Sequence, residues 1–374
     1  MRIGIDAKSF FSGPVSTTVI LQNLLPKLFS LYPQVQWIIF LDRKDKDKLF
    51  PFRQPNILIE YVWADINLIS NLFFLQPGIR NHKIDIMLYQ TFPRSTADVK
   101  SVAFVHDVLF KEYPHFFTLP EKLYFLPLKW LLPKADRIIT TTRFVANDLV
   151  KWNYSTLDKI DLAPLGVSPV FKPAQLHDAK FLQQVKQKFH LPDEYLFFAG
   201  RLNKRKNIEA IFNSLPLINN KNIQLVIAGS KHGRNAHFKM LKSAAFSKRI
   251  LFTGNVTNEE LSALYALSKI FCFPSHAEGF GLPPLEAMAS GVPAITSNTT
   301  ALPEVFGEAA IYVSPGHPAE IAAAINHLLG DKLYYELKKH QALQKASEYN
   351  WEKTAENVMH SLLKLYLSHQ PIAT

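Results

Sequence analysis

The chain has almost no cysteine, since Cys272 is the only one in its 374 residues. A single thiol forms no disulfide within a chain and supplies no cage of several thiolates for a metal ion. No apolar run reaches the roughly 18 residues that a membrane-spanning helix requires. Asp6 also stands where a signal peptide would carry its apolar core. We therefore expect a soluble, cytoplasmic protein.

The sequence also lacks internal repeats and low-complexity tracts, and its 24 prolines are scattered. Apolar residues make up 48% of the chain and charged residues 20%, which excludes a disordered or fibrous protein. A length of 374 residues is too great for one compact core and suits two domains of ordinary size.

Two common nucleotide-binding motifs are missing as well. The loop after the first expected strand has no Gly-x-Gly-x-x-Gly pattern, which argues against a dinucleotide-dependent dehydrogenase. No Walker A sequence occurs anywhere in the chain.

Positive charge is concentrated in one part of the chain, whose overall net charge is +11. Residues 186–249 hold 13 Lys and Arg against 3 Asp and Glu, whereas residues 250–374 hold 7 against 12. The local excess indicates an anionic ligand or an anionic docking surface nearby, with a solvated Lys-rich face as the alternative. No stacking aromatic residues or recognised binding motif accompany the charge, so we expect no nucleic-acid partner.

Short β-branched and aromatic runs recur along the chain, and several are continuous, as in strands buried on both faces of a parallel sheet. Amphipathic stretches lie between them, for example Thr17–Leu31, and Thr257 with Glu260 has the pattern of a capping box. This alternation predicts doubly wound α/β domains. The expected strands are Ile3–Asp6, Trp37–Leu41, Ile84–Leu88, Val102–Val105, Ile138–Thr142, Leu196–Ala199, Leu225–Ala228, Leu251–Thr253, Ile270–Phe273, Ala294–Thr296 and Ile311–Val313.

The alternation pauses at residues 164–173, where three prolines and a glycine indicate a linker. We therefore predict an N-terminal domain over residues 1–168 and a C-terminal domain over residues 169–350. A last helix, Trp351–Leu367, carries an apolar stripe that needs a surface to cover.

The most specific segment follows the expected strand Ile270–Phe273. Its glycines allow a turn close to a ligand, and Pro284 suits the first turn of a helix, where its missing donor costs nothing. Free backbone amides at this helix start would point at an anion, helped by the helix dipole. They belong to Phe280, Gly281 and Leu282.

Two carboxylates, Glu278 and Glu286, flank these amides. Such an arrangement suits a ligand with hydroxyl groups on both sides of a phosphate, as in a sugar nucleotide. The run Glu-Gly-Phe-Gly-Leu-Pro-Pro-Leu-Glu-Ala-Met-Ala-Ser-Gly-Val-Pro that begins at Glu278 resembles the Glu-x7-Glu signature of retaining glycosyltransferase family 4. The resemblance continues through Leu302-Pro303-Glu304-Val305 and Gly200-Arg201-Leu202-Asn203-Lys204-Arg205-Lys206-Asn207.

This resemblance implies the GT-B fold, in which two Rossmann-like domains face a central cleft. It implies that the N-terminal domain, residues 1–168, binds the acceptor and that the C-terminal domain, residues 169–350, binds the nucleotide-sugar donor. It also implies that residues 351–374 cross back onto the N-terminal domain. Arg201 and Lys206 match the cations that clamp the donor diphosphate, and we take their neighbours Lys204 and Arg205 to face solvent. Val256 matches the position whose backbone reads the nucleotide base.

The remaining site residues also follow from the resemblance. Glu286 would accept hydrogen bonds from the ribose, and Glu278 from the transferred sugar, in a front-face reaction without a stable glycosyl-enzyme. His106, after the strand Val102–Val105, would contact the transferred sugar, so the expected catalytic residues are Glu278 and His106. Gly13 matches a glycine-rich loop that approaches the diphosphate, although relatives often carry two glycines there.

The implied function is sugar transfer with retention from a nucleotide sugar, with GDP-mannose favoured over UDP-sugars, to a glycan or lipid-linked acceptor in surface polysaccharide biosynthesis. No cofactor and no metal are expected. The pair Asp45 and Asp47 has the spacing of a metal-binding Asp-x-Asp, but its mixed-charge surroundings favour a solvated loop. The alternatives are a sugar-nucleotide epimerase of the same architecture and a non-catalytic nucleotide-sugar-binding subunit.

Residues 121–135 interleave aromatic and leucine side chains with Lys122, Lys129 and Lys134, as in a segment at a membrane surface. A partly buried helix of the first domain is the alternative reading. With a lipid-linked acceptor, peripheral binding to the anionic inner leaflet would follow, favoured by the positive net charge.

Overall fold

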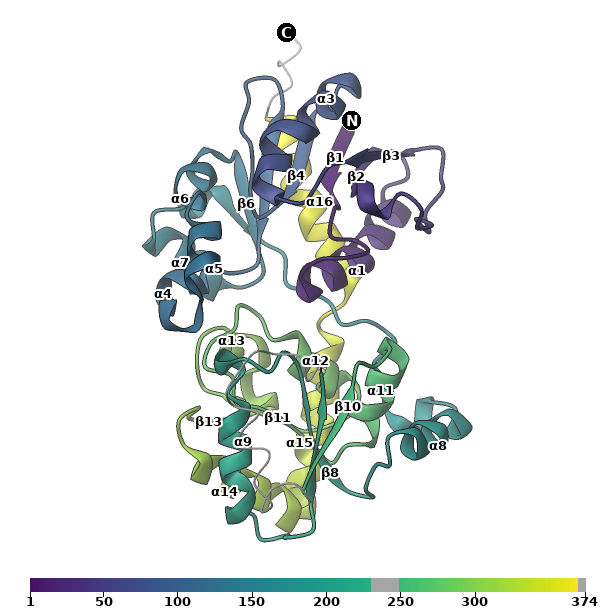
Figure 1. Cartoon of the computed structure of the whole chain (residues 1–374), viewed down its shortest axis with the longest axis vertical. Coiled ribbons are helices and arrows are strands. Elements are labelled where there is room, and N and C mark those ends of the chain that lie inside the picture. Colours follow the sequence, from purple (N-terminus) through teal and green to yellow (C-terminus); the bar gives the residue numbers. More distant parts are fainter. Residues whose placement is uncertain (230–248, 369–374) are drawn as a thin grey trace. The chain divides into compact units, whose positions relative to one another are not determined.

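The computed structural model describes residues 1–229 and 249–368, which form two compact units. The first unit comprises Met1–Gly166 and Asn350–Thr374, and the second comprises Val167–Tyr349. Each unit is a parallel sheet with helices packed against it (Figure 1). Part of the basic segment 186–249, namely residues 230–248, lies outside the described residues, as do residues 369–374.

The sheet of the first unit has the strand order β3-β2-β1-β4-β5-β6-β7, and its neighbouring strands pair in parallel. Its strands are β1 (Arg2–Asp6), β2 (Gln36–Asp42), β3 (Ile57–Val62), β4 (Ile86–Gln90), β5 (Lys100–Val105), β6 (Arg137–Thr140) and β7 (Ile160–Leu162). The central strands are buried along their length, as their continuous apolar sequences require.

Helices connect these strands and cover the sheet. They are α1 (Val15–Leu31), α2 (Asn67–Ile69), α3 (Leu75–Asn81), α4 (Leu109–Glu112), α5 (Leu119–Phe125), α6 (Leu128–Leu131) and α7 (Arg143–Lys151). A π-helical turn, η2 (Ser70–Phe74), joins α2 to α3. No helix among the described residues is both long and apolar enough to cross a membrane.

The second unit repeats the architecture with the strand order β10-β9-β8-β11-β12-β13. Its strands are β8 (Tyr195–Ala199), β9 (Gln224–Ala228), β10 (Ile250–Gly254), β11 (Ile270–Phe273), β12 (Ala294–Ser297) and β13 (Ile311–Val313). The helices with described bounds are α8 (Ala179–Lys188), α9 (Ile208–Ser214), α11 (Asn258–Leu267), α12 (Leu282–Ala289), α13 (Leu302–Phe306), α14 (Pro318–Gly330) and α15 (Lys332–Ser347). Thr257 and Glu260 form the predicted capping box of α11.

The sequence prediction missed the two edge strands of the first sheet, β3 and β7. In β3 the central residues Leu58 to Tyr61 are partly or fully exposed, so they do not form a continuous apolar run. β7 is three residues long, too short for a pattern to stand out.

The last helix, α16 (Trp351–Leu367), packs on the first unit against α1. Its apolar stripe is buried there, with Trp351 and Val358 among the covered side chains. Two hydroxyl groups fix its position, since Thr354 Oγ1 donates to the Pro164 carbonyl at 2.7 Å and Ser361 Oγ donates to Asp161 Oδ2 at 2.6 Å. The helix therefore completes a unit whose other elements all lie in residues 1–166.

The chain passes between the units twice, after Gly166 and after Tyr349. Within the first unit, a methyl group on Gly166 would overlap the backbone of Asn350 and Trp351. Within the second, the Val167 amide donates to the Tyr349 carbonyl at 3.2 Å. The two connections are therefore held side by side, and only glycine leaves room at position 166.

Candidate active site

The candidate site of the second unit lies where the strand order of its sheet reverses. β8 and β11 are neighbours at the centre of the sheet, and the chain winds outward from them in both directions. In doubly wound sheets, ligands bind beyond the carboxyl ends of the strands at such a point. The loops that follow β8 and β11 carry Arg201 to Lys206 and Glu278, respectively, so the topology brings these segments together.

The loop after β8 is shaped by two asparagines. Asn203 caps the short helix η7 (Lys204–Lys206), because its side chain accepts from the Lys206 amide at 3.1 Å. Asn207 adopts a left-handed conformation with φ of 54° and donates to the carbonyl of Pro274 at 3.0 Å. This second bond ties the β8 loop to the loop after β11.

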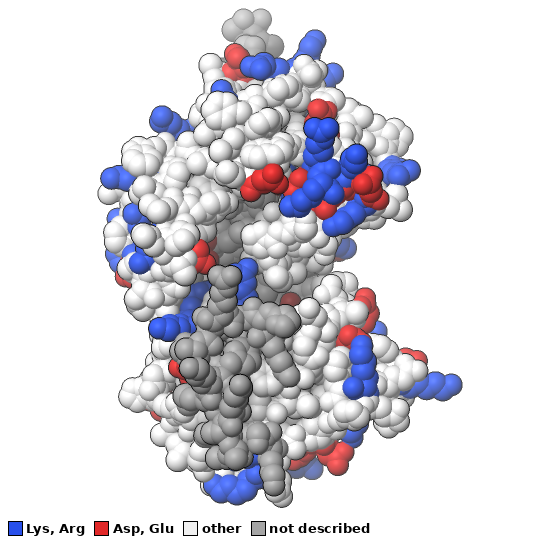
Figure 2. All heavy atoms as spheres, in the orientation of Figure 1, with Lys and Arg blue, Asp and Glu red and all other residues white. Residues whose placement is uncertain are grey.

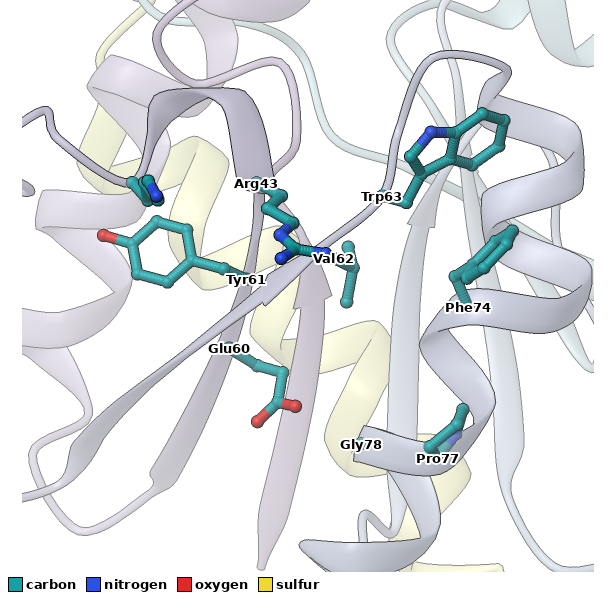
Figure 3. A pocket seen from close by; sticks show the side chains of 9 residues that line it. Arg43, Glu60, Tyr61, Val62, Trp63, Phe74, Pro77 and Gly78 are labelled. Carbon is teal, nitrogen blue, oxygen red and sulfur yellow. The ribbon is translucent and has the colours of Figure 1, made fainter.

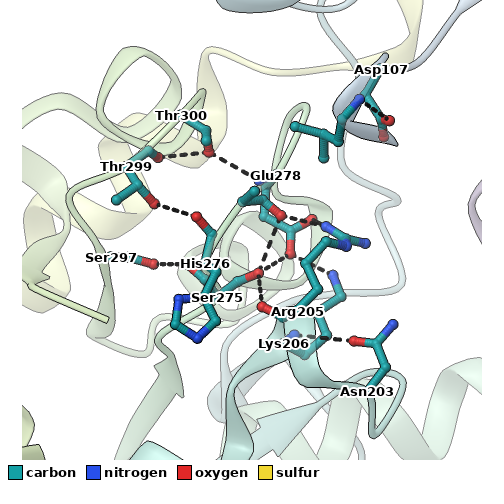
Figure 4. Close-up of polar contacts among 12 residues, drawn as sticks. Asp107, Asn203, Arg205, Lys206, Ser275, His276, Glu278, Ser297, Thr299 and Thr300 are labelled. Atoms are coloured by element: carbon teal, nitrogen blue, oxygen red, sulfur yellow. Dashed lines mark hydrogen bonds and ion pairs between the residues drawn. The ribbon is translucent and has the colours of Figure 1, made fainter. Parts of the chain in front are cut away.

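The loop after β11 is held by hydroxyl groups from neighbouring segments (Figure 4). The Glu278 amide donates to Thr300 Oγ1 at 2.9 Å, and Thr299 Oγ1 donates to the His276 carbonyl at 3.0 Å. The His276 amide in turn donates to the Arg205 carbonyl at 2.8 Å. The path of this loop is therefore fixed by the residues that precede α13 and by the loop after β8.

Glu278 lies at the centre of this network and is 7% exposed. Its Oε1 is 2.7 Å from Lys206 Nζ and accepts from Ser275 Oγ at 2.5 Å, while its Oε2 is 3.0 Å from Arg205 Nη1. Burial alone would raise the pKa of Glu278, but Lys206 and then Arg205 lower it to about 2. The carboxylate is therefore ionised throughout the physiological pH range.

Arg205 corrects one sequence-based interpretation. We expected Lys204 and Arg205 to face solvent, and Lys204 does. Arg205 instead turns inward, pairs with Glu278 and donates to the Ala277 carbonyl. A run of three cations in a three-residue helix points its members in different directions, so only a structure could assign them. Arg201 is exposed at the start of the loop.

Lys206 is largely buried, and its ammonium group lies 4.6 Å from the centre of the Phe273 ring. Burial lowers its pKa, Glu278 raises it, and the nearby charges of Arg205 and Arg201 lower it further. The structure therefore places three cations and one carboxylate in a single electrostatic cluster, which we call the Glu278 cluster: Arg201, Arg205, Lys206 and Glu278.

Glu286 has a different environment in α12. Its Oε2 accepts from the hydroxyl of Tyr265 at 3.0 Å. Burial raises the pKa of Glu286 to about 7, and the Tyr265 hydrogen bond offsets only part of this effect. Tyr265, on α11, was missed by the sequence analysis, because in sequence it is one apolar position among several in that helix.

The predicted amide nest corresponds to the start of α12. Gly281 has a φ of 103°, and a Cβ there would lie 2.7 Å from Leu302 Cδ2, so glycine is required. Leu282 begins the helix, with Pro283 and Pro284 in its first turn. The first amides of a helix have no intrahelical acceptor, so this end suits an anion. Phe280 is buried against Tyr349, with ring centres 5.7 Å apart, and anchors the turn.

Val256 follows β10 and is half-buried, at the same edge of the second sheet as the loops above. In the first unit, Gly13 is exposed, and a Cβ there would lie 2.6 Å from the side chain of Ser9.

Asp45 corrects a second interpretation, since it does not lie in a solvated loop. Its side chain is buried, accepts from Ser12 Oγ at 3.1 Å and pairs with Lys48 at 2.8 Å. Asp47 is exposed. Within residues 1–229 and 249–368, no cluster of three or more His, Cys, Asp or Glu side chains could hold a metal ion.

His106 follows β5, at the carboxyl edge of the first sheet. Neither of its ring nitrogens has a hydrogen-bond partner among the described residues, and both are buried. Burial lowers the pKa of His106 to about 4, so its imidazole is neutral at pH 7. Along the same edge, β1 ends at Asp6, which pairs with Lys8 at 2.9 Å, and β4 ends at Gln90.

Comparison with known proteins agrees with this geometry. The family model "Glycosyl transferases group 1" matches residues 180–349, and the model "Glycosyltransferase Family 4" matches residues 39–171. Between them they cover most of the chain. The chain therefore belongs to the family 4, group 1 glycosyltransferases, as the Glu-x7-Glu segment predicted.

Two relatives are mannosyltransferases of Escherichia coli. The serotype-specific mannosyltransferase WbdA is 31% identical over 245 residues, which are 64% of this chain and 30% of that protein. The O-antigen chain mannosyltransferase B is 32% identical over 227 residues, which are 59% of this chain and 58% of that protein. The chain thus matches less than two thirds of the length of either relative.

Solved structures share the fold over the whole chain. A sucrose-phosphate synthase from Thermosynechococcus elongatus has a TM-score of 0.80 at 18% identity, covering 98% of this chain and 100% of its own. The Anabaena protein HepE, solved with UDP-glucose, has a TM-score of 0.73 at 16% identity, covering 97% of this chain and 100% of its own. The predicted fold class of two Rossmann-like domains, the GT-B fold, is confirmed.

The Glu278 cluster generates a stability prediction. Replacing Arg205 with Ala leaves a buried carboxylate with one cation fewer, and we expect a loss of about 1–3 kcal/mol in the free energy of unfolding of the second unit. Lys204→Ala is the matched control and should change it by less than about 0.5 kcal/mol. Urea unfolding followed by circular dichroism measures both. All five tryptophans lie in the first unit, so their fluorescence reports that unit separately. Equal stability of the two variants would contradict the assignment.

The raised pKa of Glu286 predicts a pH dependence. Between about pH 4.5 and 7 the native carboxyl keeps a proton that the unfolded chain releases, so this group lowers the free energy of unfolding as pH rises. Glu286→Gln has no titrating carboxyl group at this position. As pH rises through this window, the free energy of unfolding of Glu286→Gln should therefore increase relative to that of wild type by up to about 1.4 kcal/mol per pH unit. Urea unfolding at four pH values tests this expectation. A difference that stays constant with pH would show that Glu286 titrates normally.

Proposed function

We propose that the protein is a retaining, metal-independent glycosyltransferase that moves a sugar, favoured as mannose from GDP-mannose, to a glycan or lipid-linked acceptor of a surface polysaccharide. The observation that carries the proposal is the Glu278 cluster beside the start of α12, at the point where the strand order reverses. The two E. coli mannosyltransferase relatives support mannose as the transferred sugar.

The charge of the Glu278 cluster suits a sugar-nucleotide diphosphate. Three cations and one carboxylate leave a net charge of +2, and the diphosphate of a nucleotide sugar carries two negative charges. Arg201 is exposed and therefore accessible to a ligand, whereas Lys206 is held in place by Glu278. As the glycosidic bond breaks, negative charge grows on the leaving diphosphate. These cations and the amides of Phe280, Gly281 and Leu282 would stabilise that charge.

The two carboxylates would hold the sugars on either side of the diphosphate. Glu278 stays ionised and can only accept hydrogen bonds, so it suits the hydroxyl groups of the transferred sugar, which can donate them. Glu286 would accept from the ribose, with Tyr265 orienting its carboxyl group. The backbone at Val256 would meet the base.

In the first unit, we assign His106 to the transferred sugar and Gly13 to the diphosphate. The neutral imidazole of His106 has one donor and one acceptor nitrogen, and neither has a partner among the described side chains and backbone. A sugar hydroxyl group can satisfy either nitrogen. Asp45 is occupied by Ser12 and Lys48, so the proposal gives it no metal to bind.

The test combines a donor screen with variants of the cluster. Turnover with GDP-mannose, UDP-glucose and UDP-galactose is measured with and without EDTA, and the anomeric configuration of the product is read by NMR. We expect turnover with GDP-mannose, retention, no effect of EDTA, and a loss of about 10²-fold or more in Arg201→Ala. Glu286→Ala should weaken binding of free GDP in calorimetry, because free GDP keeps the ribose that Glu286 would hold. An inverted product, or an absolute need for Mg²⁺ or Mn²⁺, would overturn the proposal.

A second proposal concerns residues 121–135, which include most of α5 and all of α6. Leu128 and Leu132 are buried in the first unit's core, whereas Leu123 is 58% exposed and Trp130 is 55% exposed. Lys129 and Lys134 are exposed beside them. The segment is thus a partly buried helical region whose outer face combines apolar and basic side chains, and we propose that this face rests on an anionic membrane.

Vesicle binding tests the membrane proposal. The full chain should sediment with vesicles containing anionic phosphatidylglycerol more than with neutral phosphatidylcholine vesicles, and less at high salt. The double variant Leu123→Glu/Trp130→Glu should lose most of this binding. Leu333→Glu, at an exposed leucine of α15, is the control and should bind like wild type. Equal binding by both variants would rule out this face.

A further inference from the structure

A groove in the first unit has no role in the proposed donor site. It lies along β3, the outermost strand of the sheet, and has a volume of about 500 Å³. Its walls come from the turn after β2, from the last residues of β3 and from the η2–α3 region (Figure 3). The residues that line it are Arg43, Lys46, Glu60, Tyr61, Val62, Trp63, Phe74, Pro77 and Gly78.

Aromatic rings form the apolar part of this groove. Trp63 and Phe74 lie together on one side, with ring centres 5.0 Å apart, and Tyr61 lies across from them (Figure 3). Phe74 is 47% exposed and Tyr61 37% exposed, although an aromatic ring buries a large apolar area when it is covered. Ring faces are thus available at the wall of a concave site, which is where a ligand would cover them.

Charged groups provide hydrogen-bonding positions in the same groove. Glu60 is fixed by His82, whose Nε2 lies 3.0 Å from Glu60 Oε2, and the Glu60 side chain is 37% exposed. Figure 2 shows Lys and Arg side chains gathered over this side of the unit with acidic ones beside them. Lys44 and Lys48 are paired with Asp42 and Asp45. Among the residues that the structure describes, Arg43 and Lys46 form no ion pair, so both can donate to a ligand.

We propose that this groove binds the saccharide chain of the acceptor, at a distance from the sugar that reacts. A pyranose has an apolar face of C–H groups, which packs on aromatic rings, and a rim of hydroxyl groups. Those hydroxyl groups accept from Arg43 and Lys46 and donate to Glu60. The Glu60 carboxylate would repel a purely anionic ligand. A purely apolar ligand would remove water from Arg43, Lys46 and Glu60 without replacing its hydrogen bonds.

The position of the groove within the first sheet supports an acceptor chain as its occupant. Trp63 and Arg43 follow the carboxyl ends of β3 and β2. At the same edge β1 ends at Asp6, β4 ends at Gln90, and His106 follows β5. The strand order reverses between β1 and β4, and β3 is two strands away. Two strand spacings are about 10 Å. A glycan whose end lay at the reversal point would therefore extend over β2 toward the groove.

The inference rests on the proposed function, because it assumes a glycan acceptor, but its first test does not need turnover. Binding of linear α-mannose oligosaccharides of one to six residues is measured by calorimetry without nucleotide. Wild type should bind the longer oligosaccharides, and Phe74→Ala and Tyr61→Ala should weaken this binding about tenfold or more. Phe73→Ala is the matched control: Phe73 is next in sequence, 64% exposed and outside the groove, and its variant should bind like wild type.

Kinetics provide the second readout. For oligosaccharide acceptors, the two groove variants should raise KM about tenfold and leave kcat unchanged, whereas the KM for a monosaccharide acceptor should not change. No oligosaccharide binding by wild type, or equal effects of Phe73→Ala and Phe74→Ala, would overturn the inference and leave the proposed function intact. Oligosaccharide binding in a chain that turns over no nucleotide sugar would support the groove and overturn the proposed function.

Discussion

The paired charge of Glu278 is the interaction on which the candidate site depends. Lys206 and Arg205 reach it from the loop after β8, and Ser275 reaches it from the loop after β11. A carboxylate this deeply buried would take up a proton without such partners. The same contacts therefore fix both its charge and the relative position of two loops from neighbouring strands. The site is prepared by the protein's own ion pairs, at the place where a doubly wound sheet leaves its strand ends open.

The contrast between the two signature carboxylates follows from their surroundings. Glu278 and Glu286 are near each other in the sequence and both are largely shielded from water, yet their pKa values are about 2 and about 7. Glu278 faces two cations, and their charge lowers its pKa by more than burial raises it. Glu286 faces the neutral phenol of Tyr265, so burial determines its pKa. The same residue type therefore occurs in two chemical states within one short segment of the chain.

The sequence was a good guide to buried and glycine-dependent features and a poor one to surface features. Continuous apolar runs marked the central strands, and the turn at Gly281 was recognisable because its conformation and packing require glycine. The edge strand β3 was missed because one side of it faces the groove and solvent, so its pattern is mixed. Arg205 was expected to face solvent, because a run of three cations in the sequence does not show which side chain points inward. Tyr265 and Asp45 were not recognised as buried polar partners, because their partners Glu286 and Ser12 are distant in sequence.

The return of α16 to the first unit has a consequence for synthesis of the chain. The second unit is a continuous insertion, so it can fold as soon as Tyr349 has left the ribosome. Residues 1–166 of the first unit are synthesised first, but α16 is synthesised only after the second unit. Until then, the surface that Trp351, Val358 and Leu362 cover is exposed to water. The first unit is therefore begun before the second in translation but can be completed only after it.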